Sequence, residues 1–181
     1  MNFLSIEHFL IHELDFSLSK RQKAIDWVLE KQISSEKIIQ WLDQTSGKSK
    51  VHLLCFCETL AKQEPFFFEN HLDYFLKIAS EETHESNKRS LTNLYIIFLK
   101  KTYKTITDSQ KEKLVERCFS WLLDESLIAT QCNCLTCLEY LSQDQQWIRE
   151  ELLQIIDKDF TSKPPSYQSR ARKILKKLGR N

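Results

Sequence analysis

Apolar residues recur along this sequence in the spacing of an amphipathic helix. Ten clusters follow the form apolar, two residues, apolar, apolar, which places three side chains on one helical face. Their first positions fall 14 to 24 residues apart, which leaves room for one helix and a short connection each time. No stretch alternates apolar and polar residues as a half-buried strand does, so the pattern predicts an all-α protein. The clusters are Ile6, Phe9 and Leu10; Ala24, Trp27 and Val28; Ile38, Trp41 and Leu42; Cys57, Leu60 and Ala61; Leu72, Phe75 and Leu76; Leu94, Ile97 and Phe98; Cys118, Trp121 and Leu122; Cys134, Cys137 and Leu138; Leu152, Ile155 and Ile156; and Ala171, Ile174 and Leu175.

Residues typical of helix ends stand between these clusters. Candidate N-caps, whose side chains accept hydrogen bonds from a first turn, are Ser19, Ser34 or Ser35, Asp108 and Asp144. Prolines that suit first helical positions are Pro65, Pro164 and Pro165. Glycines that can close a helix in the left-handed conformation are Gly47 and Gly179.

A longer period appears when the predicted helices are taken in pairs. The second members begin their clusters at residues 24, 57, 94, 134 and 171, in steps of 33, 37, 40 and 37. Helical-hairpin solenoids have this period, because one hairpin cannot bury its apolar stripe alone and stacks on the next. We therefore expect an α-α superhelix of about five antiparallel helix pairs, forming one domain over residues 1–181.

Composition agrees with a single helical domain. The chain has 181 residues, of which 41% are hydrophobic and 28% charged, and it has too few glycines (2) and prolines (3) for the many turns of a sandwich or barrel. Lys and Arg (26) nearly balance Asp and Glu (25), which is unlike a dedicated nucleic-acid binder. The sequence shows no signal peptide and no apolar membrane span, so we expect a cytoplasmic protein without a membrane partner.

The repeat pattern resembles the HEAT-like superfamily, whose antiparallel helix pairs form a curved right-handed superhelix. Three stretches resemble short bacterial HEAT-like proteins that carry the label adenylosuccinate lyase: "CFSWLLDESLIA" (118–129), "WIREEL" (147–152) and "SRARKILKKL" (169–178). Genuine lyases of that name have a Ser-Ser-x-Met-Pro-x-Lys-x-Asn loop. The only methionine here is Met1, so this loop is absent and we expect no lyase activity.

The resemblance implies a non-enzymatic scaffold that binds a macromolecule, most simply a protein, along a concave or basic surface. The alternative is a nucleic-acid-binding protein similar to the HEAT-like alkylpurine glycosylases, which hold a carboxylate and tryptophans in a basic concave cleft. No motif here assigns those residues. We expect no cofactor, because two glycines cannot build a phosphate-binding loop or a nucleophile elbow.

Cysteine and histidine groups are interpreted mainly as structural. Cys134 and Cys137 fall on the apolar face of their helix, whereas Cys132 points about 160° away from Cys134, so the three thiols do not converge on one ion. A thiol switch and a metal site remain the alternatives. His8 and His12 lie one helical turn apart without a third ligand in view. We therefore expect no metal.

Charge is the one pattern that packing does not explain. Basic residues gather near the predicted starts of second helices, where they oppose the helix dipole. If second helices line one side of the superhelix, these residues form a stripe suited to an acidic partner or a phosphate backbone. The alternative is that they belong to an ordinary solvated face, because their registers within the helices differ and Thr130 and Gln131 interrupt the series in the fourth repeat. The candidate residues are Lys20, Arg21, Lys23, Lys48, Lys50, Lys88, Arg89, Arg170, Arg172 and Lys173.

Overall fold

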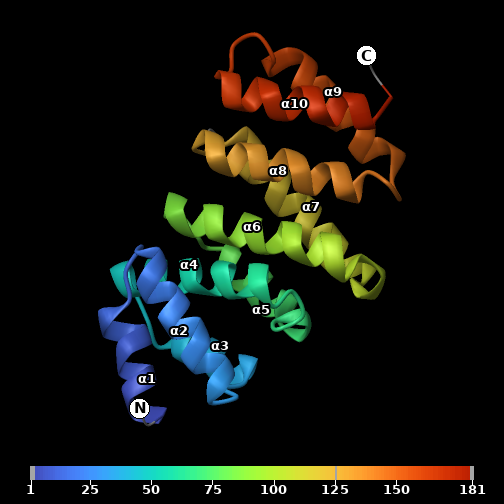
Figure 1. Ribbon diagram of the computed structural model, residues 1–181. Coiled ribbons are helices and arrows are strands. Elements are labelled where there is room, and N and C mark those ends of the chain that lie inside the picture. Colours follow the sequence, from blue (N-terminus) through green and yellow to red (C-terminus); the bar gives the residue numbers. More distant parts are fainter. Residues whose placement is uncertain (1–2, 125, 180–181) are drawn as a thin grey trace. The chain divides into compact units, whose positions relative to one another are not determined.

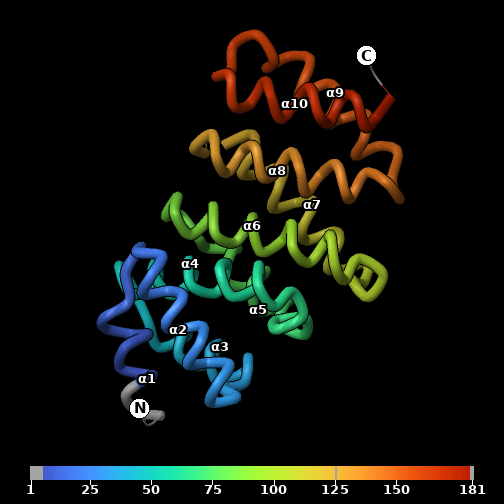
Figure 2. The backbone as a smooth tube through the Cα atoms, viewed as in Figure 1, coloured from blue at the N-terminus to red at the C-terminus, as the bar shows by residue number. Residues whose placement is uncertain are grey.

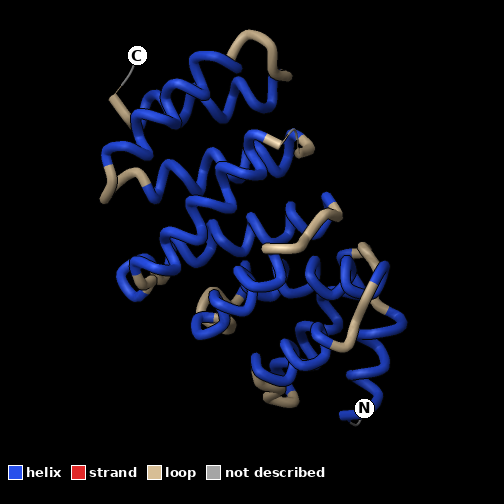
Figure 3. Tube along the Cα trace, turned by 180° about the vertical axis from the view of Figure 1, so that it is seen from behind, coloured by secondary structure: helices blue, strands red, loops and turns tan. Residues whose placement is uncertain are grey.

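A computed structural model describes residues 3–124 and 126–179 of the chain, and this part holds ten α-helices and no strand (Figures 1 and 3). The helices are α1 (Phe3–His8), α2 (Leu18–Glu30), α3 (Ser35–Asp43), α4 (Gly47–Gln63), α5 (Leu72–Ala79), α6 (Glu85–Lys101), α7 (Asp108–Leu123), α8 (Ile128–Leu141), α9 (Gln146–Asp159) and α10 (Pro165–Lys177). Three short elements lie between them: a π-helix, η1 (Phe9–Glu13), and the 3-10 helices η2 (Glu69–His71) and η3 (Tyr103–Thr105).

The apolar spacing predicted these helices correctly. Each of the ten clusters lies in its own helix, with the first cluster running from α1 into η1. Nearly all cluster residues are buried, and only Trp27, Ile97 and Leu175 are partly exposed. A single apolar stripe per helix was therefore enough to find each element.

Several predicted helix ends are shifted. Ser17, not Ser19, caps α2, because its hydroxyl accepts from the amide of Lys20 at 3.2 Å. Ser34 caps α3 as predicted. Asp108 is the first residue of α7, and Thr107 caps that helix.

The other end signals were right in part. Asp144 does not cap α9, because its carboxylate accepts from Tyr103 at 2.7 Å and Lys111 at 2.8 Å. Pro165 starts α10 as predicted, whereas Pro65 lies in a turn before α5. Gly179 is left-handed (φ +76°) just after α10. Gly47 is left-handed too (φ +53°), but it opens α4 and does not close α3.

The chain divides into two compact units, residues 1–69 and 70–181. In the first unit α4 packs against α2, α3 and η1, and α1 packs against α2 and η1; Figure 2 traces this path in blue and cyan. Its largest fully buried side chains include Trp41, Phe56 and Ile25. No helix in the described part of either unit is long and apolar enough to cross a membrane.

In the second unit α8 is the central helix. It packs most extensively against α6, α7 and α10, and it also contacts α9, while α5 packs against α6 and α7 (Figure 1). Because helices lie on several sides of α8, residues all around it are buried. These include the polar side chains Thr130, Gln131 and Thr136 as well as Leu138.

The central position of α8 explains why Cys132, which the helical period places away from Cys134, is not exposed. Cys134 and Cys137 are buried as predicted, but Cys132, on the other side of α8, is also buried at 8% exposure. Sequence periodicity assumes one apolar face, and α8 has two. A hydroxyl at Cys132 therefore replaces a buried thiol, and Cys132→Ser is not the silent change that an exposed position would allow.

The central role of α8 can be tested by introducing a charge. We expect Leu138→Asp to lower the free energy of unfolding by about 3 to 5 kcal/mol, because Leu138 is fully buried and an uncompensated charge there is strongly unfavourable. Urea unfolding followed by circular dichroism measures the loss. The matched control is Ala129→Asp, which adds the same charge to an exposed position of the same helix and should change stability by less than about 0.5 kcal/mol. Equal losses in both variants would contradict the packing described above.

Candidate anion-binding surface

Helices α6, α8 and α10 of the second unit run parallel and are joined by side chains. Glu85 at the start of α6 accepts from the amide of Leu127 at 2.9 Å, and further along Asn133 of α8 bonds to Thr92 and Asn93 of α6. Contacts that advance together on both helices require parallel directions. The faces of α6, α8 and α10 that carry these contacts are called the second-helix surface below.

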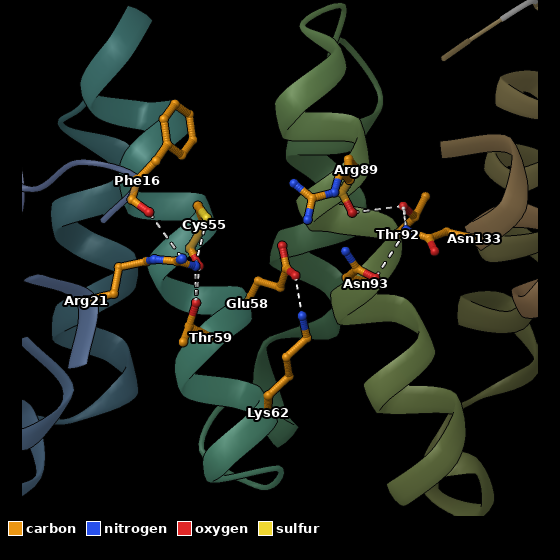
Figure 4. A network of polar contacts seen from close by, with 10 residues as sticks. All are labelled: Phe16, Arg21, Cys55, Glu58, Thr59, Lys62, Arg89, Thr92, Asn93 and Asn133. Carbon is orange, nitrogen blue, oxygen red and sulfur yellow. Dashed lines mark hydrogen bonds and ion pairs between the residues drawn. The ribbon is translucent and has the colours of Figure 1, made fainter. Parts of the chain in front are cut away.

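A threonine hydroxyl forms the bridge between α6 and α8. Thr92 is fully buried and its Oγ1 donates within its own helix, toward the carbonyl oxygens of Lys88 at 2.9 Å and Arg89 at 3.0 Å. The same oxygen accepts from Asn133 Nδ2 at 3.1 Å, and that amide nitrogen also donates to Asn93 Oδ1 at 3.1 Å (Figure 4). The bridge therefore fixes the orientation of the Asn133 amide.

The same arrangement occurs between α8 and α10. Thr136 Oγ1 donates to the carbonyl of Cys132 at 3.0 Å and accepts from Arg170 Nη1 of α10 at 2.7 Å. Further along both helices, Lys177 of α10 forms an ion pair with the largely buried carboxylate of Glu139 at 2.9 Å. The guanidinium of Arg170 is thus held in place by a neutral hydroxyl.

The first unit contains a third bridge of this kind. Thr59 Oγ1 of α4 donates to the carbonyl of Cys55 at 2.8 Å and accepts from Arg21 Nη1 of α2 at 2.7 Å. Arg21 also contacts Cys55 Sγ at 3.2 Å and the carbonyl of Phe16 at 3.2 Å (Figure 4). Thr59, Thr92 and Thr136 therefore each donate to a carbonyl of their own helix and accept from a neighbouring helix, which precedes α4 in the chain but follows α6 and α8.

The candidate basic residues of the second unit point in different directions. Lys88 is only 14% exposed and pairs with Glu85 at 2.9 Å. Arg172 bonds to Gln168 at 3.2 Å and lies over Phe160, toward α9. Arg89 and Lys173 are exposed and, together with Arg170, form no ion pair with a described carboxylate. These last three carry the net positive charge of the second-helix surface.

The candidate residues of the first unit are likewise divided. Lys20 pairs with Asp15 at 3.0 Å, and Lys23 lies over the ring of Trp27 at 4.6 Å. Lys48 and Lys50 are in the first turn of α4, exposed and half-exposed respectively. Arg21 reaches the neighbouring helix α4 through its hydrogen bond to Thr59. Within each unit, fewer basic residues are therefore left to form the predicted stripe than the sequence suggested, because several pair with a carboxylate or lie over an aromatic ring.

Three contributors were missed by the sequence reading. Asn93 and Asn133 are neutral, and Lys177 is in the last turn of α10, away from the helix starts where basic residues were sought. The sequence separation between contacting residues could have indicated them. Asn93 and Asn133 are 40 residues apart, and Glu139 and Lys177 are 38 apart, which matches the predicted repeat.

Glu85 is the carboxylate that anchors the N-terminal end of this surface. Burial raises the pKa of the Glu85 carboxyl, but hydrogen bonds from Lys88 Nζ and the Leu127 amide, with a weaker one from Thr130, outweigh it, so the net pKa is lowered. The carboxylate is therefore charged at neutral pH and holds Lys88 away from the exposed cations.

The six cysteines are free and buried. Cys134 and Cys137 lie in hydrogen-bonding contact with Cys118 of α7, and burial raises the pKa of both thiols. His8 and His12 are exposed, with ring centroids 4.9 Å apart. Within residues 3–124 and 126–179, no three His, Cys, Asp or Glu side chains form a set that could hold a metal ion.

Comparisons of the chain with protein-family models, with curated proteins and with solved structures found no match. The surface is therefore interpreted from its own geometry.

The threonine bridge gives a test by double-mutant cycle. Thr92→Val keeps the side-chain shape but removes the hydroxyl, so we expect a loss of about 1 to 3 kcal/mol in the free energy of unfolding. Asn133→Ala removes the partner amide. If the bridge exists, the two losses are not additive, with a coupling of about 0.5 to 3 kcal/mol in urea unfolding. Thr161→Val, at an exposed loop position, is the control, and additive losses would refute the bridge.

The lowered pKa of Glu85 gives a test by pH. A carboxyl with a lowered folded-state pKa stabilises the fold above its unfolded-state pKa, and this contribution disappears as pH falls through the folded-state value. We therefore expect Glu85→Gln to destabilise the protein more at neutral pH than in acid, as measured by chemical unfolding across pH. Glu81→Gln, which changes an exposed carboxyl in the preceding loop, should show no such trend. A pH-independent loss in Glu85→Gln would contradict the assigned electrostatics.

Proposed function

We propose that this protein is a non-enzymatic, HEAT-like repeat scaffold that binds an acidic protein partner through the second-helix surface. The observation that carries the proposal is the set of Arg89, Arg170 and Lys173, three cations that no described carboxylate neutralises. In a superhelix of stacked hairpins this surface forms the concave side, where such scaffolds bind partners.

The spacing of the polar contacts supports a repeat. The bridges Arg21–Thr59, Thr92–Asn133 and Thr136–Arg170 join residues 38, 41 and 34 positions apart. These separations are close to the steps of 33, 37, 40 and 37 residues between the apolar clusters. In each bridge one threonine hydroxyl accepts from a side chain of a helix about one period away, on the preceding helix for Thr59 and on the following helix for Thr92 and Thr136, and such separations are expected of a repeated structural unit.

The chemistry of the surface favours carboxylates as ligands. Arg170 presents a planar guanidinium whose orientation is fixed by Thr136, and such a fork binds a carboxylate through paired hydrogen bonds. The cations are separated by neutral amides such as Asn133 and by the Lys177–Glu139 pair. A phosphate backbone needs a denser row of cations, so a nucleic acid is the less favoured partner.

Charge reversal tests the surface. We expect a labelled oligoglutamate peptide to bind the wild-type protein at low salt, and the double variant Arg89→Glu/Lys173→Glu to bind it roughly tenfold more weakly, because both exposed cations are replaced by anions. Fluorescence anisotropy measures both affinities. The matched control, Lys104→Glu/Lys158→Glu, makes the same change of charge at exposed positions outside the second-helix surface and should retain binding.

Two outcomes would reject the proposed partner. Equal weakening in both double variants would mean that net charge, and not the second-helix surface, determines binding. Tighter binding to a short DNA duplex than to the peptide, with affinity falling steeply as salt rises, would instead favour the nucleic-acid alternative.

A further inference from the structure

A second charged site lies in the second unit, between α5 and α7. The two helices pack against each other and border a pocket of about 540 Å³. Three cations line it: Lys77 from the last turn of α5, and Lys113 and Arg117 from α7. Its volume lies within the range of small-molecule sites.

None of these cations forms an ion pair with a described carboxylate. Lys113 and Arg117 stand one helical turn apart, where like charges repel, and Lys77 adds a third positive charge across the pocket. Arg117 is half-buried, and its guanidinium is held 5.8 Å from the ring centroid of Trp121. Lys77 and Lys113 are exposed, and the repulsion among the three cations is reduced when an anion enters the pocket.

Two carboxylates, Asp73 and Glu116, also line the pocket, so its charged side chains are three cations and two anions. Asp73 Oδ2 accepts from Gln110 Nε2 at 2.8 Å. Gln110 is itself fixed, because its side-chain oxygen accepts from the Thr107 amide at 3.0 Å in the capping box of α7. The capping box therefore orients Asp73 toward the start of α7, and Glu116 is left as the only carboxylate of the pocket without a hydrogen bond in the described residues.

We propose that this pocket binds the dianion of a phosphate monoester, with Lys77, Lys113 and Arg117 each contacting the phosphoryl oxygens. A phosphoryl group offers three strong acceptor oxygens and close to two negative charges at neutral pH, which suits three donors on two helices better than a planar carboxylate does. Ser80 is not a further donor, because its hydroxyl proton goes to the carbonyl of Lys77 at 2.7 Å. The pocket size indicates a phosphorylated small molecule.

Titration of the full chain with phosphoserine tests this proposal. Isothermal calorimetry should show binding of phosphoserine and none of serine, and the affinity should fall below the second phosphate pKa of about 6 as the dianion is protonated. Lys113→Gln should weaken binding roughly tenfold by removing one charge-assisted contact. Glu116→Gln should strengthen binding several-fold, a gain that misfolding cannot mimic.

A phosphoserine peptide distinguishes the two sources of such a ligand. If the peptide binds more tightly than free phosphoserine, the ligand is a phosphorylated protein; if it binds more weakly, the ligand is a phosphorylated small molecule.

The controls separate this site from the second-helix surface. Lys173→Gln and Lys104→Gln remove exposed cations elsewhere and should leave phosphoserine affinity unchanged. Equal binding of serine and phosphoserine, or an unchanged affinity in both Lys113→Gln and Glu116→Gln, would overturn the proposal. Neither result bears on oligoglutamate binding, so the pocket and the second-helix surface are tested independently.

Discussion

The structure depends on side-chain hydrogen bonds between parallel helices, because the backbone amides and carbonyls inside each helix are already paired. Inside a helix each amide and carbonyl is already paired, so only side chains connect one helix to the next. The Thr92 hydroxyl makes such a connection, because it donates to the Lys88 carbonyl of its own helix α6 and accepts from the Asn133 amide of α8. Because the hydroxyl is fully buried, both bonds must be made, and this requirement fixes the position of α8 along α6.

The same bonds that join the helices also determine which charges face solvent. Glu85 and Ser126 hold Lys88 near the start of α8, whereas Arg89, one residue later, turns to solvent. Thr136 holds Arg170 without neutralising it, since a hydroxyl accepts a hydrogen bond but carries no charge. The exposed positive charge of this surface therefore follows from the choice of neutral partners inside it.

Sequence reasoning found the helices because burial of an apolar stripe imposes a period that is visible in one chain. It failed where a helix has neighbours on more than one side. Cys132 and Thr136 occupy the second buried side of α8, which no single-face period can indicate. Charge signals were less reliable still, because Lys20 and Lys88 look alike in sequence to Arg89 and are distinguished only by carboxylates that the fold brings near. Asn133 carried no charge signal at all.

The two charged regions of the second unit share one buried side chain. Trp121 of α7 is 2% exposed, with Arg117 5.8 Å and Lys88 6.0 Å from its ring centroid. Arg117 lines the pocket beside α5, and Lys88 belongs to the polar contacts between α6 and α8. A cation near an indole face is attracted by the ring quadrupole, and both cations draw on this one ring. A smaller residue at 121 would therefore remove the ring contact of Arg117, whereas Lys88 would keep its ion pair with Glu85 and its hydrogen bond to Ser126.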